Sequence, residues 1–205
     1  LPYCDQIAIS RLSQAKMLRQ AGITADLLML RLPMMSEIPE LVALTQYSLN
    51  SQFCVIRQIE EECKCQNKQH KVILMADEGD LREGYWDKTQ LIEDALRIEQ
   101  QMHHVCLAGI GVNLGCYGSI LPSTQNLGDL VQIAREIEQR IGRKLEIVSG
   151  GATTSLHLML TGAMPEGINH LRIGEAIMNA RDLHDRRGMN TDFLDPHVVT
   201  LKAEV

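Results

Sequence analysis

The stretch Val72-Ile73-Leu74-Met75-Ala76-Asp77-Glu78-Gly79-Asp80-Leu81-Arg82-Glu83-Gly84 joins a short apolar run to a loop rich in charge and glycine. The apolar run predicts a buried β-strand. The loop supplies carboxylates, glycines that permit sharp turns, and Arg82, a cation with five hydrogen-bond donors. In parallel α/β proteins the loops at the carboxyl ends of strands bind ligands, so this junction is a candidate anion or carboxylate site. A salt-bridged turn explains the same residues about equally well.

Composition excludes several classes of function. The 205 residues are enough for one sizeable core. A net charge of −6, with both signs interspersed, argues against nucleic acid or an acidic membrane surface as a partner. The six cysteines show no disulfide or metal-ligand spacing, so we expect reduced thiols, no metal and a cytoplasmic location. No apolar run reaches the roughly 18 residues of a membrane span.

Short apolar segments alternate with helical patterns along the whole chain. The predicted strands are 6–9, 27–31, 47–49, 72–76, 105–109, 145–148 and 170–173. Apolar residues spaced by three and four predict helices over 51–66 and 126–141, with Asn126 as a cap and Gly142 as the end of the second. The three glutamates at 60–62 are expected to be solvated surface.

This β-α-β order implies parallel strands with crossover helices, hence an α/β fold. A closed parallel barrel has eight strands, and seven are visible here. Because the chain begins abruptly at Leu1, we expect the first strand to precede this sequence. A doubly wound open sheet is the alternative, although no Gly-x-Gly-x-x-Gly follows any strand.

In a barrel the carboxyl ends of the strands converge on one mouth. Residues 149–155, Ser-Gly-Gly-Ala-Thr-Thr-Ser, are typical of an anion cradle, with helix capping as the alternative. With Arg82 and Arg172 they predict a phosphorylated ligand. His170 lies two residues before Arg172 and is interpreted as structural rather than catalytic. The residues expected at the mouth are Ser10, Arg11, Arg31, Ser48, Asn50, 77–82, 113–118, 149–155 and 172–175.

Three motifs occur in order: Asp77-x-Gly-x-x-Arg-x-Gly, Ser149-Gly150-Gly151 and Ile168-Asn169-His170-Leu171-Arg172-Ile173-Gly174-Glu175-Ala176. Together they resemble the pyridoxal 5′-phosphate (PLP)-dependent amino acid racemases of the alanine racemase N-terminal barrel fold, closest to the ornithine racemase group. The resemblance covers nearly the whole chain. It implies a (β/α)8 TIM-type barrel of the fold-type III PLP enzymes over residues 1–190, lacking the first strand in this chain. Residues 191–205 would begin a C-terminal β domain.

The resemblance also implies the cofactor, PLP, and the residues that bind it. Arg82 would lie near the phenolic oxygen and Arg172 would face the pyridine nitrogen. Asn113 stands where alanine racemases carry a ring-stacking histidine. The phosphate would be held by the hydroxyl of Thr153 or Thr154 and by the backbone N–H groups of Gly174 and Glu175.

Three departures from the family pattern concern the site. The group usually has asparagine where this chain has Ala152, and aspartate where it has Ile9. The Schiff-base lysine of the family lies on the first strand, so we expect it upstream of Leu1. None of the seven lysines here is predicted at the carboxyl end of a strand. Cys116 and Tyr117 are expected near the mouth, where they could approach a substrate.

The resemblance implies an isomerase, an amino acid racemase that removes and returns an α-proton. Ornithine or another basic amino acid would be the substrate, with an acidic partner among Asp77, Glu78, Asp80 and Glu83. A homodimer is implied. The alternative is a single-domain PLP-binding or PLP-homeostasis protein of the same barrel fold without racemase activity. A third interpretation is an inert remnant without activity. A decarboxylase of this fold is also possible, but the glycine-rich phosphate motif of such enzymes is not evident in this sequence.

Overall fold

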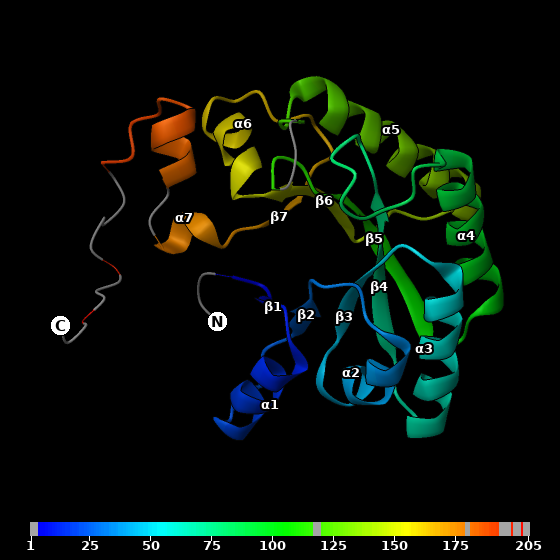
Figure 1. The fold of residues 1–205 in the computed structure, drawn as a ribbon. Helices are drawn as coiled ribbons and strands as arrows, with labels where there is room; N and C mark the ends of the chain where they lie inside the picture. The colour runs from blue at the N-terminus through cyan, green and yellow to red at the C-terminus, as the bar shows by residue number, and fades with distance from the viewer. Residues whose placement is uncertain (1–3, 117–119, 179–180, 193–197, 199–201, 203–205) are drawn as a thin grey trace.

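The computed structural model describes residues 4–116, 120–178, 181–192, 198 and 202. Seven strands pair in parallel, each with its neighbours in sequence. They follow an arc with the helices on its outside (Figure 1). The strands are β1 (Ile7–Ile9), β2 (Leu27–Met29), β3 (Tyr47–Asn50), β4 (His70–Ala76), β5 (Val105–Val112), β6 (Ile147–Ala152) and β7 (His170–Arg172).

The predicted barrel of parallel strands and crossover helices is confirmed in nearly closed form. β1 and β7 are the two edges of the sheet, and no pairing joins them within the described residues. The helices are α1 (Leu12–Gln20), α2 (Ile38–Leu44), α3 (Phe53–Gln66), α4 (Lys88–Gln101), α5 (Thr124–Ile141), α6 (Leu156–Leu160) and α7 (Glu175–Met178). The short helical turns are η1 (Met35–Glu37), η2 (Thr153–Ser155) and η3 (Asp182–Arg186).

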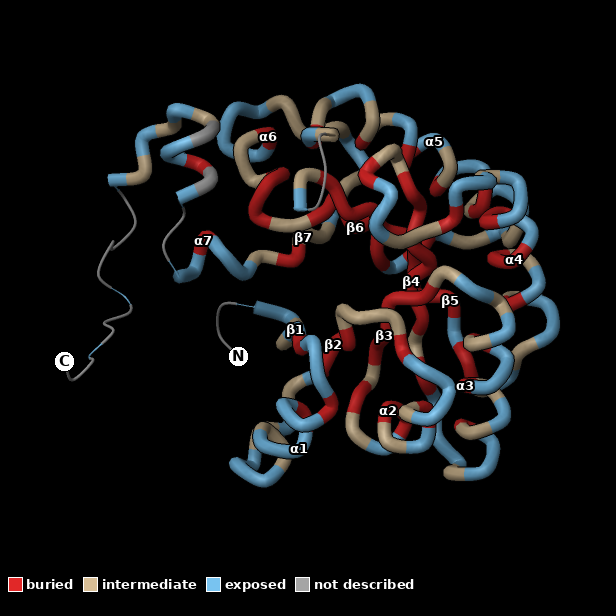
Figure 2. Tube along the Cα trace, in the orientation of Figure 1, coloured by how far each residue is buried: buried red, intermediate tan, exposed pale blue. Residues whose placement is uncertain are grey.

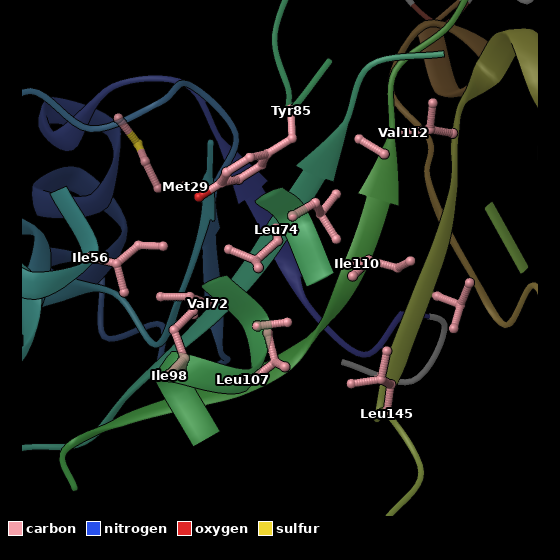
Figure 3. Close-up of a cluster of buried hydrophobic side chains, with 14 of the residues drawn as sticks. Met29, Ile56, Val72, Leu74, Tyr85, Ile98, Leu107, Ile110, Val112 and Leu145 are labelled. Atoms are coloured by element: carbon pink, nitrogen blue, oxygen red, sulfur yellow. The ribbon is translucent and has the colours of Figure 1, made fainter. Parts of the chain in front are cut away.

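Alternation along the strands divides the buried residues of the sheet between two clusters, one on each face. Val72 and Leu74 belong to the larger cluster, which lies between the sheet and the helices (Figure 3). Ile73 and Met75 belong to a smaller cluster on the concave face. Successive side chains of a strand point to opposite faces, so both faces of β4 are buried. The tube of β4 in Figure 2 is accordingly coloured mostly as buried.

The cap of α5 differs from the prediction. Ser123, not Asn126, is the N-cap: its hydroxyl accepts the Asn126 N–H at 3.2 Å, and the Asn126 carbonyl oxygen accepts the Ser123 N–H at 2.8 Å. This is a reciprocal capping box, in which Asn126 plays the part usually taken by glutamate or glutamine. Gly142 ends the helix as predicted, with a positive φ of 76°.

Glu60 is not the solvated residue that was expected. Its carboxylate accepts the backbone N–H groups of His103, His104 and Val105 at 3.0, 2.9 and 2.6 Å. Burial raises its pKa, but these hydrogen bonds outweigh burial and lower the pKa overall. Glu60 therefore ties α3 to the beginning of β5.

Two groups expected in loops at the mouth differ from the prediction. Ser48 and Asn50 occupy the face of β3 opposite to Tyr47 and Leu49, and both are buried. Ser48 contacts the ring of His70 at 2.9 Å on the neighbouring strand. Residues 149–152 belong to β6, so only 153–155 form the turn after it.

The predicted start of a C-terminal domain at 191–205 falls largely outside the described residues, as does Tyr117, and both stay predictions. In the part of the chain that the structure describes, no helix combines the length and apolarity needed to cross a membrane. The same part contains no group of three or more histidine, cysteine, aspartate or glutamate side chains placed to hold a metal ion.

Candidate functional site

A cavity of about 590 Å³ lies at the carboxyl ends of the strands, and we call it the mouth cavity. Residues from each of the seven strands or the loops that follow them line it, which confirms the predicted convergence. Three predicted site residues, Arg82, Asn113 and Arg172, are among them. The lining is Ser10, Leu30, Arg31, Leu32, Leu49, Arg82, Glu83, Asn113, Cys116, Ala152 and Arg172.

Arg172 is a buried cation with neutral hydrogen-bond partners. It ends β7 with 9% of its surface exposed, and it donates to the Ser149 hydroxyl and, at 2.8 Å, to the Val112 carbonyl. Burial lowers its pKa to about 10. The backbone beside it is closely packed at Gly111, where a Cβ would lie 3.1 Å from Cβ of Ser149 and 3.3 Å from Sδ of Met75. The remaining N–H groups are available to a ligand acceptor in the mouth cavity.

Arg82 lies on a loop whose base is closed by the backbone. Tyr85 N–H donates to the Met75 carbonyl at 2.7 Å, and Asp77 N–H donates to the Tyr85 carbonyl at 3.1 Å. This bridge holds the ends of the loop together beside β4. The Arg82 side chain is 47% exposed, and its Nε lies 3.1 Å from the Glu83 carboxylate. The loop therefore places Arg82 at the cavity wall, where Glu83 neutralises its charge.

Four carboxylates flank Arg82, and Glu83 is the one that lines the mouth cavity. The Asp77 carboxylate accepts the N–H groups of Gly79 and Leu81 at 2.8 and 3.1 Å. Glu78 pairs with Lys88 at 3.0 Å. Asp80 is buried and is not in the cavity lining. Of the four carboxylates expected to bind a basic substrate, only Glu83 lies in the cavity lining, where it could contact the substrate.

The turn after β6 contains a hydroxyl cluster whose members have different roles. Thr154 donates its proton to the Leu114 carbonyl at 2.7 Å, so this hydroxyl has no proton left for a ligand. Thr153 accepts the N–H of Ala176 at 3.1 Å and keeps its own proton. Ser155 Oγ is buried with no hydrogen-bond partner among the described residues. Thr153 and Ser155 therefore keep hydroxyl protons that no described residue takes up, although neither residue lines the mouth cavity. Ser155 belongs to the predicted anion cradle 149–155 but was not among the residues expected to bind the phosphate.

Gly174 and Glu175 follow β7 after Ile173 and are exposed. The Thr153–Ala176 hydrogen bond brings this segment against the turn after β6. No heavy atom lies within 4 Å of a Cβ placed on Gly174, so the space beside its backbone is open. Neither residue lines the mouth cavity itself.

Asn113 and Cys116 follow β5 at the wall of the cavity. Asn113 is 8% exposed, and its carbonyl oxygen accepts from the Cys116 thiol at 3.5 Å. The predicted nearness of Cys116 to the mouth is confirmed. Ala152, one of the noted departures, also lines the cavity and brings only a methyl group there.

One lysine lies where none was predicted. The Lys88 ammonium contacts the carbonyl of Asp77, at the carboxyl end of β4. It is held there by Glu78 and does not line the mouth cavity. Lys71 confirms the prediction, since its amine lies 2.7 Å from Glu146 and 2.9 Å from the Tyr47 hydroxyl, near the start of β4.

Comparison with known proteins gives a consistent picture. Residues 2–182 match the family model described as alanine racemase, N-terminal domain. The chain is 37% identical to an ornithine racemase of Acetoanaerobium sticklandii and 39% identical to a lysine racemase of Thermotoga maritima, over 98% and 96% of its length. It spans only 57% and 53% of those relatives.

Solved structures share the fold at lower identity. PipY of Synechococcus elongatus, with PLP bound, superposes with a TM-score of 0.65 and 18% identity, over 82% of this chain and 78% of that one. An alanine racemase of Clostridium difficile in complex with cycloserine gives 0.67 and 17%, over 84% of this chain and 46% of that one. At these identities the likeness supports the barrel fold and nothing finer.

Proposed function

We propose, since this chain belongs to the alanine racemase N-terminal domain family, that it is the barrel of a PLP-dependent amino acid racemase. The observation that carries the proposal is the pair of arginines at one cavity, Arg82 and the buried Arg172, at the positions that the family motifs assign to the cofactor. The names of the two curated relatives point to the same reaction.

The donors on the chain fit PLP. A phosphate needs several hydrogen-bond donors, and Thr153 and Ser155 both have a hydroxyl proton that no described residue takes up. The open backbone at Gly174 allows close approach of an anion. A pyridine nitrogen is an acceptor, and Arg172 has spare N–H groups and only neutral partners. The buried Ser155 hydroxyl, which lacks a partner among the described residues, is costly without a ligand of this chemistry.

PLP, when bound, withdraws electrons from the amino acid α-carbon and makes its proton acidic. Arg172 keeps its charge because its pKa of about 10 is well above neutral pH. A cation facing the pyridine nitrogen leaves that nitrogen without a proton, which limits the electron withdrawal. Arg82, neutralised on one side by Glu83, directs its remaining N–H groups to oxygen atoms in the cavity.

The proton-transferring lysine is proposed to come from a segment upstream of Leu1. Two observations support this. None of the residues that line the mouth cavity is a lysine. In the described structure β1 and β7 each pair with one neighbouring strand, so each has one unpaired edge. A homodimer and a cytoplasmic location are part of the same proposal. The six cysteines, all without disulfide partners, agree with a reducing compartment.

The proposed substrates are amino acids with a second, basic amino group. Glu83 is the carboxylate in the cavity lining, with 15% of its side chain exposed. It can accept a distal ammonium group while it holds Arg82 with its other oxygen. An amino acid with a short apolar side chain would leave this carboxylate without that partner.

Racemisation is tested with the protein extended at its N-terminus, supplied with PLP in deuterium oxide. L-Ornithine, L-lysine and L-alanine are each followed for α-deuterium by mass spectrometry and for the D-enantiomer by chiral chromatography. We expect both products with ornithine or lysine and much less with alanine. PLP binding without deuterium exchange for any substrate would instead favour the alternative, a PLP-homeostasis protein.

A further inference from the structure

Arg172, Ser149 and His170 form a continuous hydrogen-bonded chain on the concave face of β6 and β7. Ser149 and His170 are paired across the two strands, and Arg172 follows His170 by two residues, on the same face. The Ser149 hydroxyl lies 2.8 Å from Nδ1 of His170 and accepts from Nη1 of Arg172. No role in the proposed function has been assigned to His170 or Ser149.

One arrangement of the protons gives every donor of this chain an acceptor. A guanidinium has donors and no acceptor, so the Ser149 oxygen accepts from Arg172. The Ser149 proton then needs an acceptor of its own, and Nδ1 of His170 is within reach. Nδ1 is therefore unprotonated, and the neutral ring carries its proton on Nε2. Burial, and then the charge of Arg172, lower the pKa of His170 to about 4, which agrees with a neutral ring.

We infer that His170 is a positioning residue that orients the Arg172 guanidinium toward the mouth cavity through the Ser149 hydroxyl. The inference rests on the proposed function for the identity of the ligand. Arg172 has two protein acceptors, Ser149 and the Val112 carbonyl, and within the described residues no carboxylate lies at ion-pair distance from it. If a substitution at position 170 removes the acceptor atom, the Ser149 hydroxyl proton loses its partner and interferes with the approach of Arg172. Arg172 then loses one of its two protein acceptors, the Ser149 hydroxyl, and keeps the Val112 carbonyl.

The other charged groups around His170 lie at the opposite end of the barrel. There the ring lines a second cavity of about 290 Å³. Glu146 in that lining is already bound to Lys71, which limits its influence on the ring. The titratable or charged groups facing His170 are Asp5, Asp26, Tyr47 and Glu146 from this cavity and Arg172 from its own strand.

The first test needs no cofactor. Nitrogen-15 NMR of the imidazole rings in the purified protein separates neutral tautomers from the charged form. We expect a ring in the Nε2–H form that stays neutral down to about pH 5, assigned by its absence in His170→Asn. His103→Asn, at an exposed ring, is the matched control and should leave this signal in place. A His170 ring that is charged at pH 7, or protonated on Nδ1 alone, would overturn the inference.

The second test measures PLP binding to folded variants, with the melting temperature as a check on folding. His170→Leu and Ser149→Ala remove the chain and should each raise the dissociation constant for PLP roughly tenfold, as for a hydrogen bond to a charged group. His170→Asn keeps an acceptor and should stay within about twofold of the parent protein. Equal weakening by Asn and Leu would contradict the inference. If the N-terminally extended parent protein fails to bind PLP, the proposed function fails, and the NMR result still decides the hydrogen-bonded chain.

Discussion

The Tyr85 hydroxyl donates to the buried carboxylate of Asp94 at 3.0 Å, and this contact anchors the Arg82 loop to α4. Asp94 is 3% exposed and also accepts from Gln90 at 3.1 Å and Arg97 at 3.0 Å. Burial, together with the Asp94 charge, raises the pKa of Tyr85, so the phenol stays a donor at any physiological pH. The loop is thus held at the end nearest the backbone bridge to β4.

Tyr85→Phe removes this one hydrogen bond and leaves Asp94 with two partners. We expect the free energy of unfolding to fall by about 1 kcal/mol, measured by urea denaturation. Asp94→Asn keeps an acceptor for Tyr85 and is the matched control, whereas Asp94→Ala should cost more. A Phe variant as stable as the parent would contradict the anchoring role.

Gly84 has a φ of 128°, and a Cβ there would lie 2.6 Å from the Asp77 backbone nitrogen. Gly84→Ala should therefore displace the Arg82 loop and lower both stability and PLP affinity. Gly128→Ala in α5 is the control, because no atom lies within 4 Å of its Cβ, and should stabilise the protein by up to about 1 kcal/mol. Thermal denaturation of both variants checks the contrast, and a Gly84→Ala variant with unchanged melting and PLP binding would contradict it.

Thr153 and Thr154 should respond differently to removal of the hydroxyl. Thr153→Val is expected to weaken PLP binding by roughly tenfold, because its proton is the one available to a phosphate. Thr154→Val removes the donor to the Leu114 carbonyl and should cost about 1 kcal/mol of stability, with a smaller change in affinity. Titration with PLP and urea denaturation separate the two effects, and the reverse order of affinities would refute the assignment.

Glu83→Gln should distinguish basic from apolar substrates. Loss of the negative charge is expected to raise KM for ornithine about tenfold, while the much lower activity toward alanine changes less. Since glutamine can still hydrogen-bond Arg82, the loop should remain in place. A parallel loss with both substrates would mean that Glu83 acts only by holding Arg82. Glu78→Gln, on the same loop but outside the cavity lining, is the control.

Stability should fall in mild acid because of buried histidine. His70 is 1% exposed, and burial lowers its pKa to about 4. In the unfolded chain it protonates near pH 6.5, so the unfolded chain binds more protons below that pH. The free energy of unfolding should be constant above about pH 7 and about 2 kcal/mol lower at pH 5, from His70 alone. His70→Asn should reduce the fall between pH 7 and pH 5 by about 2 kcal/mol and leave the share that comes from His170, whereas the exposed His103→Asn should not change the profile. A flat profile in the parent protein contradicts the prediction.

The barrel was predictable because the strands carry strong local signals. All seven predicted strands exist, and β4 shows why: its apolar run is long enough to fill both faces and ends at a sharp change of composition. The end of α5 at Gly142 was equally readable, since glycine favours the left-handed cap. Such features depend on the local chain and need no knowledge of its neighbours.

Features that depend on distant partners were not predictable. Glu60 reads as surface in the sequence, yet it binds backbone groups 43 to 45 residues away. Ser48 and Asn50 look like mouth residues until the strand register places them on the outer face. Thr153 and Thr154 are the same residue type, and they differ because the Thr154 hydroxyl donates to the Leu114 carbonyl. The sequence therefore predicted which residues form the candidate site, whereas the contacts show which of the two threonine hydroxyls keeps its proton.

The most direct test of the account is addition of PLP to the N-terminally extended protein, followed by borohydride and peptide mapping. We predict an absorption band above about 400 nm that borohydride abolishes, with the covalent adduct on a lysine upstream of Leu1. Arg172→Gln should weaken this binding, and Arg135→Gln, an exposed arginine on α5, should leave it unchanged. The absence of any band or adduct in the extended protein would contradict the assignment of the mouth cavity as a PLP site.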